Sequence, residues 1–177
     1  LVGMNGDINA GKTPIALLLA CMAINPASCQ QVEIVSGLTM SAMPGNVLYL
    51  DTELEKDRLC HTVQNSWKRR LKNRQEDIAR LHYYPLRHIK TVDRLKSINV
   101  LAQQIPDISF MVIDSLTQMV CDKMDYKEAT VVIDGLFEII DKYAFPIFTT
   151  INGNRGDDSG KGTGHIGAVL QEKASTY

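Results

Sequence analysis

The 177 residues carry a net charge of −1, and 45% of them are hydrophobic and 22% charged, which is ordinary for a soluble globular protein. The length suits a single domain with a full core, and no apolar run is long enough to cross a bilayer, so we expect a cytoplasmic protein without a membrane partner. The near-zero charge gives no overall field that favours nucleic acid, although a local patch can still bind phosphates.

Short apolar runs alternate along the chain with longer amphipathic stretches. We interpret residues 1–2 as the end of a first strand, and an apolar stretch of good helix formers follows at 14–24. Further strands are predicted at 47–50, 81–84, 110–113 and 146–151, and further helices at 55–74, 92–104 and 127–142. Continuous apolar runs are typical of strands that are covered on both faces. The alternation therefore predicts an α/β fold with a mostly parallel central sheet flanked by helices.

Residues 26–45 interrupt this alternation. They contain a short strand candidate at 32–35 and the turn-rich run SGLTMSAMPG, which we interpret as an excursion with a small hairpin. Residues 174–177 resemble the start of another strand. Since both ends look cut within a strand, we expect residues 1–177 to be one domain, the core of a longer chain.

The stretch GDINAGKT at residues 6–13 matches the phosphate-loop pattern G-x-x-x-x-G-K-[ST] at every fixed position. In such a loop, glycine lets the backbone approach the phosphates, and successive amides point inward at the positive end of the following helix. The lysine reaches the β- and γ-phosphates, and the threonine hydroxyl joins the Mg²⁺ shell. The alternative is a chance glycine turn, but an apolar strand end precedes the stretch and an uninterrupted helix follows it.

This loop predicts the residues that bind ATP. They are Gly6, Asp7, Ile8, Asn9, Ala10, Gly11, Lys12, Thr13 and Pro14. Pro14 fits in the first helical turn because the amide hydrogen that it lacks would have no partner there. Because Lys12 reaches the β- and γ-phosphates, we also predict it as a catalytic residue.

Two of the predicted strands end in acidic residues. FMVID ends in Asp114, which we predict as the carboxylate on the metal side, so that Thr13 and Asp114 hold Mg²⁺. VLYLDTELE places Asp51, Glu53 and Glu55 after another apolar run. Hydrolysis of ATP needs a carboxylate that positions the attacking water, and we predict Glu53 for this role and Glu55 for the helix start. The alternative is that these acids only cap the next helix.

Four features in this order resemble the RecA-like ATPases, in particular the branch near hexameric replicative helicases of the RepA and DnaB type. The features are GDINAGKT, the strand followed by DTE, the strand followed by DS, and PIFTTIN followed by a glycine-rich loop. The resemblance covers nearly the whole chain and implies one RecA-like P-loop domain that hydrolyses ATP with Mg²⁺. It implies a catalytic glutamate at Glu53, a Walker B aspartate at Asp114 and a polar sensor at Asn152. A turn residue in INGN is the alternative for Asn152.

The same resemblance implies a homo-oligomer, such as a hexamer, and single-stranded DNA bound by the loop after the sensor. That loop, NGNRGDDSGKGTGHIG, holds Arg155 and Lys161 as candidate cations. Asp157 and Asp158 offset their charge, so a mobile solvated loop is the alternative. GHIGAVLQEKA is similar to a stretch of ATPases from bacterial plasmids and conjugative transposons, which implies work in DNA replication, mobilisation or unwinding.

Other functions and sites stay open on the sequence. A nucleotide-dependent regulatory module would bind ATP without nucleic acid, and a P-loop kinase would phosphorylate a small molecule. The run WKRRLKNR at 67–74 is either a phosphate-binding stripe or the solvated end of a helix. The four cysteines form no CxxC pair and the four histidines show no ligand spacing, so we expect buried reduced thiols and no metal on histidine.

Overall fold

The structure, a computed structural model, describes residues 1–7, 11–29, 39–72, 74–153 and 164–174. Within them, five strands form one sheet in the order β1-β5-β4-β2-β3, and every strand pair is parallel. The strands are β1 (Val2–Gly6), β2 (Asn46–Asp51), β3 (Leu81–Pro85), β4 (Ile108–Asp114) and β5 (Ile147–Asn152). The expected α/β fold with a parallel central sheet is therefore confirmed.

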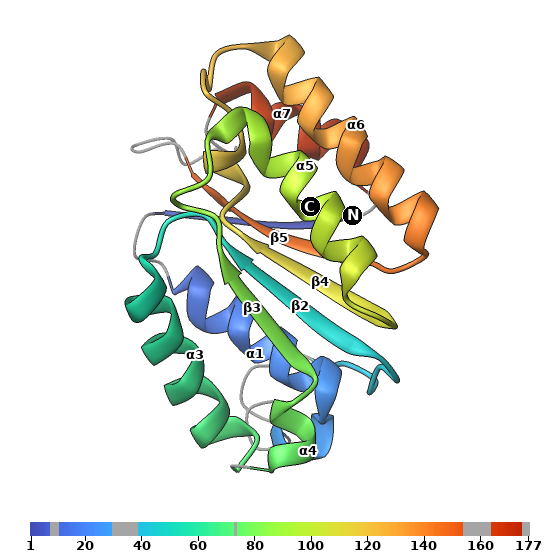
Figure 1. The fold of residues 1–177 in the computed structure, drawn as a ribbon. Helices are drawn as coiled ribbons and strands as arrows, with labels where there is room; N and C mark the ends of the chain where they lie inside the picture. Colours follow the sequence, from blue (N-terminus) through green and yellow to red (C-terminus); the bar gives the residue numbers. More distant parts are fainter. Residues whose placement is uncertain (8–10, 30–38, 73, 154–163, 175–177) are drawn as a thin grey trace.

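Helices cover both faces of this sheet (Figure 1). One face carries α1 (Lys12–Ile24) and α3 (Lys56–Arg70), with the short α4 (Gln75–Ile78) beyond them. The other face carries α5 (Thr91–Gln104), α6 (Tyr126–Tyr143) and α7 (Gly164–Lys173). Two short 3-10 helices, η1 (Pro26–Cys29) and η2 (Leu116–Met119), complete the described elements. Within these elements, no helix combines the length and the apolar character needed to span a bilayer.

The central strands supply side chains to two separate cores. Alternate residues face alternate sides: Leu48, Leu50, Met111 and Ile113 pack with α5, α6 and α7, whereas Val47, Tyr49, Phe110 and Val112 pack with α1 and α3. All eight side chains are buried. Successive side chains of a strand point to opposite faces, so a strand covered on both sides needs apolar residues at every position. Burial on both faces therefore explains why the strands are continuous apolar runs in the sequence.

Most sequence predictions of elements agree with the structure, with differences at their ends. The first strand extends beyond residues 1–2 to Gly6. The helix predicted at 55–74 is wrong at its end, because α3 stops at Arg70, Leu71 is buried and Lys72 takes a left-handed φ of 48°. The helix α7 was not predicted. The strand candidate at 32–35 and the last residues, 175–177, lie outside the described part of the chain.

Gly45 lies where the chain enters β2, in close contact with the turn before β4. A Cβ at Gly45 would lie 1.8 Å from the carbonyl oxygen of Asp107. The same oxygen accepts a hydrogen bond from the backbone N–H of Asn46 at 2.8 Å, so it cannot move away freely. The side chain of Arg80 also donates to the carbonyl of Gly45 at 2.7 Å. A side chain at position 45 would therefore displace backbone that aligns β2 with β4.

We expect Gly45→Ala to lower the free energy of unfolding by about 1–3 kcal/mol, the usual cost of overpacking. Gly135→Ala in α6 is the matched control, because its Cβ would lie 2.4 Å from Cδ2 of Leu95, the movable end of a side chain. Alanine also favours a helix over glycine by up to about 1 kcal/mol, so this control should change stability little. Urea unfolding measures both variants, and equal losses would contradict the contact assigned to Gly45.

Candidate functional site

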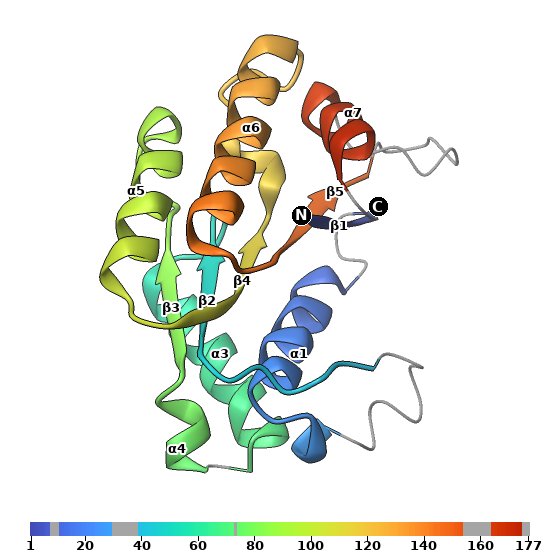
Figure 2. The ribbon, with the colours of Figure 1, turned by 90° about the vertical axis from the view of Figure 1, so that its right-hand side faces the viewer.

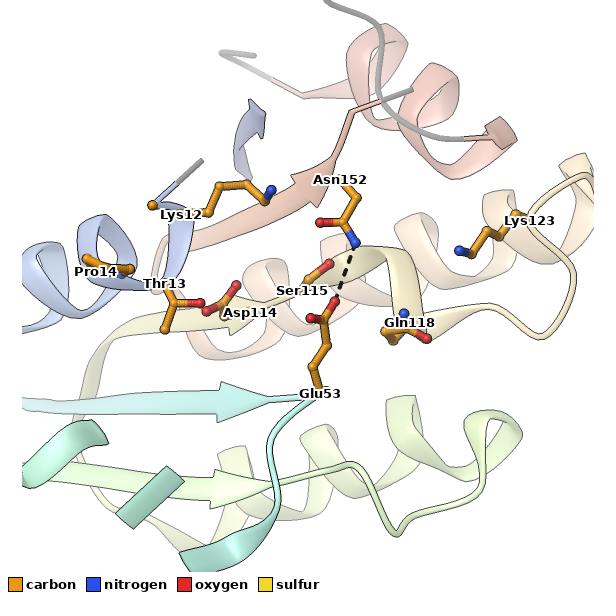
Figure 3. Close-up of a pocket in the computed structure, with 10 residues that line it drawn as sticks. Lys12, Thr13, Pro14, Glu53, Asp114, Ser115, Gln118, Lys123 and Asn152 are labelled. Atoms are coloured by element: carbon orange, nitrogen blue, oxygen red, sulfur yellow. Dashed lines mark hydrogen bonds between the residues drawn. The ribbon is translucent and has the colours of Figure 1, made fainter. Parts of the chain in front are cut away.

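A cavity of about 520 Å³ opens at the edge of the sheet where the strands end. Figure 2 shows the strand arrows pointing toward this edge, and Figure 3 shows the cavity. Its walls come from the start of α1, the ends of β2, β4 and β5, and the segment that links β4 to α6. The lining residues are Gly11, Lys12, Thr13, Pro14, Glu53, Asp114, Ser115, Gln118, Lys123 and Asn152. All the residues predicted as catalytic or metal-binding are among them.

The wall formed by α1 is a helix N-terminus without a side-chain cap. Gly11 is the N-cap residue and takes a left-handed conformation with φ 80° and ψ 21°, which favours glycine. A Cβ at Gly11 would meet no atom within 4 Å, so the backbone angle, not crowding, requires glycine there. The first helical turn contains no acidic residue. Its unpaired N–H groups and the positive end of the helix dipole therefore favour an anion in the cavity.

Lys12 lies between this helix and the end of β1. Its side chain is buried, and its ammonium donates hydrogen bonds to the carbonyl oxygens of Gly6 at 2.6 Å and Asp7 at 2.5 Å. Burial lowers the pKa of Lys12, and the negative charges of Asp114, Glu53 and Asp7 oppose this change. An ammonium has three hydrogens, so one more acceptor can be bound without breaking either contact. The predicted loop residues Ile8, Asn9 and Ala10 lie outside the described residues.

Thr13 and Asp114 both line the cavity. Asp114 ends β4 and is 4% exposed, and Thr13 lies in the first turn of α1. In Figure 3 the hydroxyl of Thr13 points toward the carboxylate of Asp114. The hydroxyl groups of Tyr49 and Thr150 donate to the two oxygens of that carboxylate. A hydroxyl and a carboxylate are ligand types that Mg²⁺ accepts, so this pair fits the ion expected from the sequence.

The end of β2 is tied to the end of β4. The carboxylate of Asp51 is 1% exposed and accepts hydrogen bonds from the backbone N–H groups of Glu53 at 2.8 Å and Leu54 at 2.6 Å. The hydroxyl of Thr52 donates to the carbonyl oxygen of Ser115 at 2.8 Å and accepts from its N–H at 2.9 Å. These contacts turn the chain sharply after β2. They hold the backbone of Glu53 at the cavity, beside the end of β4.

Glu53 and Asn152 meet in the cavity although 99 residues separate them in the sequence. The side-chain amide of Asn152 donates to Oε1 of Glu53 at 3.4 Å, the dashed line in Figure 3. The backbone N–H of Asn152 donates to the hydroxyl of Thr117 at 2.9 Å, and Arg87 donates to the carbonyl oxygen of Glu53 at 2.8 Å. Both backbones are thus fixed, while the carboxylate of Glu53 stays exposed to the cavity.

Glu55 is directed elsewhere. It is the N-cap residue of α3, as the sequence predicted for the helix start, but its side chain accepts no capping hydrogen bond from the helix. Its carboxylate instead pairs with Arg87 at 3.0 Å and with His88 at 2.5 Å. Glu55 does not line the cavity. The structure therefore separates the two glutamates by position, one in the cavity and one in a surface ion pair.

Sequence reasoning missed three residues that line the cavity, namely Ser115, Gln118 and Lys123. They follow Asp114 closely, so the signal that could have found them is their place just after a strand end. Figure 3 shows the ammonium of Lys123 pointing into the cavity. The backbone under Gln118 is held by Arg94, a buried side chain that donates to the carbonyl oxygens of Gln118 and Ile89. Lys12 and Lys123 therefore lie on opposite sides of the Glu53–Asn152 pair in the cavity.

The other sequence candidates lie away from this cavity or outside the described residues. In the basic run, Trp67 packs edge-on against Tyr83, and Arg74 pairs with Glu76 and Asp77, which favours the interpretation as a helix end over a binding stripe. The loop cations and acids Arg155, Asp157, Asp158 and Lys161 lie outside the described part. Cys21 and Cys29 are buried as expected, but the expectation is wrong for the half-buried Cys60 and the exposed Cys121.

Comparison with known proteins gives no family for this chain: neither the models of protein families nor the curated proteins contain a match. Its function is therefore inferred from the residues of the cavity and their arrangement.

Burial raises the pKa of Asp51 from its ordinary value of 3.8 to about 7, and the N–H groups of Leu54 and Glu53 offset only part of this effect. The folded chain then holds this proton more tightly than the unfolded chain does. The contribution of Asp51 to stability should therefore fall as the pH rises from about 4 to about 7 and stay constant above that range.

Asp51→Asn tests this pH dependence, since asparagine keeps an oxygen for the two N–H groups but does not titrate. We expect the stability of Asp51→Asn relative to the unaltered chain to increase between about pH 5 and pH 7, by at most about 1.4 kcal/mol per pH unit. Urea unfolding at several pH values measures the difference. Asp57→Asn, at an exposed position of α3, controls for the loss of one negative charge. A difference for Asp51→Asn that is independent of pH would contradict this assignment.

Proposed function

We propose that the chain is a P-loop ATPase with a RecA-like fold, which binds ATP with Mg²⁺ in the strand-end cavity and hydrolyses ATP by in-line attack of water. The observation that carries this proposal is the meeting of three groups in one cavity. These are the uncapped start of α1 with Lys12, the facing pair Thr13 and Asp114, and the Glu53–Asn152 pair.

The phosphates are assigned to the start of α1. The unpaired N–H groups of its first turn and the ammonium of Lys12 are donors with positive charge, which is the arrangement that binds phosphate oxygens. Pro14 supplies no N–H group, so it costs no donor that a phosphate would use. The loop pattern G-x-x-x-x-G-K-[ST] over residues 6–13 supports the same assignment.

The metal is assigned to Thr13 and Asp114. Among the described residues there is no group of three or more histidine, cysteine and acidic side chains that could hold a metal ion. Mg²⁺ does not require one, because it keeps several waters and takes other ligands from substrate phosphates. When bound, Mg²⁺ would neutralise charge on the β- and γ-phosphate oxygens. The chain would contribute the Thr13 hydroxyl and the Asp114 carboxylate, directly or through water.

The attacking water is assigned to Glu53. Its exposed carboxylate can accept a proton or a hydrogen bond from water, and the amide of Asn152 limits the directions that it can take. The side chain of Asn152 thus acts on Glu53. Because β5 lies between β1 and β4, Asn152 lies between the loop that would bind phosphate and the aspartate that would bind metal.

The proposed output is work on DNA, in replication, mobilisation or unwinding, by a homo-oligomer. This part of the proposal rests on the resemblance to RecA-like ATPases. It is tested by the rate of ATP hydrolysis with and without single-stranded DNA, because a regulatory module that only binds ATP would show no stimulation.

Replacement of the loop lysine tests the nucleotide site. We expect Lys12→Ala to weaken binding of ATP with Mg²⁺ by about tenfold or more, equivalent to about 1.4 kcal/mol, since it removes a charge-assisted contact. Lys68→Ala, at an exposed position of α3, removes the same charge outside the cavity and should leave affinity unchanged. Isothermal titration calorimetry measures both. Equal affinity of Lys12→Ala and the unaltered chain would contradict the phosphate assignment.

The two glutamates after β2 provide a second test. Glu53→Gln should leave ATP binding nearly intact and reduce hydrolysis by about a hundredfold or more, because a water-positioning carboxylate acts mainly in the transition state. Glu55→Gln is its matched control and should change turnover little, since Glu55 pairs with Arg87 and His88 outside the cavity. Phosphate release assays at saturating ATP measure both rates. Loss of hydrolysis in Glu55→Gln alone would move the catalytic assignment to Glu55.

A further inference from the structure

The carboxylate of Asp114 is held by a hydroxyl group from each of the two neighbouring strands. On β2, the phenol of Tyr49 donates to Oδ2 at 2.9 Å. On β5, the hydroxyl of Thr150 donates to Oδ1. Tyr49 and Thr150 are 0% exposed, and Asp114 is 4% exposed. The three side chains therefore form a buried group, with Asp114 on β4 and one donor on the strand at each side of it.

The sheet register explains why these side chains meet. Thr149 is aligned with Ile113, so Thr150 is level with Asp114, and Asp51 is aligned with Asp114 on the other side. Tyr49 precedes Asp51 by two positions, which places it on the same face as Asp51. This is the face that carries α1, and with it Lys12 and Thr13.

We propose that Tyr49 and Thr150 are positioning residues for the metal, which hold the carboxylate of Asp114 in the orientation that faces Thr13. The proposal rests on the proposed function, because it concerns the same site. It assigns a role to two buried residues that no motif in the sequence identifies.

Neutral donors suit this role. A lysine or arginine in the same position would neutralise Asp114 and weaken its attraction for a cation, whereas two hydroxyl groups leave its negative charge in place. Each carboxylate oxygen has a second lone pair, which stays available for a metal or for a metal-bound water. A phenol is protonated at neutral pH, so Tyr49 is a neutral donor to this carboxylate.

The simpler alternative is that the hydroxyl groups only satisfy a buried carboxylate, as folded chains generally require. The two explanations predict different results for metal binding. Groups that orient a metal ligand typically change metal affinity by about 10–100-fold when they are removed. Groups that only stabilise the fold change the free energy of unfolding without a specific change in the response to Mg²⁺.

The test replaces each hydroxyl separately by the closest side chain that lacks it, in Thr150→Val and Tyr49→Phe. We measure the Mg²⁺ concentration that gives half-maximal binding of a fluorescent ATP analogue, and separately the binding of that analogue without metal. We expect each variant to need about tenfold more Mg²⁺, with metal-free binding unchanged. Thr150→Ser keeps the hydroxyl and should restore most of the response.

Two matched controls lie beside these residues. The hydroxyl of Thr149 is equally buried but donates to the carbonyl oxygen of Ile113 at 3.0 Å, so Thr149→Val removes a buried hydroxyl that does not contact Asp114. Tyr83 is aligned with Tyr49 on β3, and its hydroxyl contacts Cys60 at 3.4 Å, so Tyr83→Phe is the control for the phenol. Neither control should change the Mg²⁺ requirement.

An unchanged Mg²⁺ requirement in folded Thr150→Val and Tyr49→Phe would overturn the proposal, and so would an equal change in the controls. Loss of folding in both variants would also overturn it, because the hydroxyl groups would then serve the fold itself. These outcomes differ from failure of the proposed function. If the proposed function fails, Mg²⁺ will not change the binding of the analogue to the unaltered chain. The proposal on positioning would then fail together with the proposed function.

Discussion

The parallel alignment of the strand ends is the constraint on which the cavity depends. Gly6 is level with Asn152 across β1 and β5, and Asp51 is level with Asp114 across β2 and β4. The carboxyl ends of neighbouring parallel strands lie at the same edge of a sheet. Residues that follow different strands therefore come together there although they are far apart in the sequence. A shift of one residue in any of these pairs would turn the polar side chains at the strand end to the opposite face.

The second requirement is to bury charge at this edge without losing it. Lys12 and Asp114 are almost inaccessible to water, and each is surrounded by hydrogen-bonding partners from the backbone or from hydroxyl groups. A buried charge is costly unless it is hydrogen-bonded or paired. In the described structure, Lys12 uses the carbonyl oxygens of Gly6 and Asp7 for this purpose, so its contact with a phosphate would be added to an ammonium that is already held in place.

Much of this arrangement could be predicted from the sequence. The strands were recognisable because both faces are buried, and the loop residues Gly11, Lys12 and Thr13 because their pattern is specific. Asp114 and Glu53 were found by their position after apolar runs. The end of α3 was not predicted, since buried Leu71 continues the spacing of the helix although the chain has already left it.

The remaining parts depend on contacts between strands, which one sequence does not display. Nothing near Tyr49 or Thr150 in the sequence indicates that both reach Asp114, because this depends on the lateral order of β2, β4 and β5. The same holds for the contact between Glu53 and Asn152. Lys123 lines the cavity, and its backbone carbonyl accepts a hydrogen bond from the N–H of His165 in α7, a helix that the sequence analysis did not recognise.

The most direct test of the account is a crystal structure of the chain with a non-hydrolysable ATP analogue and Mn²⁺, whose anomalous scattering locates the metal. The account predicts the metal between Thr13 and Asp114, the triphosphate at the N-terminus of α1 in contact with Lys12, and Glu53 facing the terminal phosphate. A triphosphate or a metal bound elsewhere, with this cavity unchanged, would contradict it.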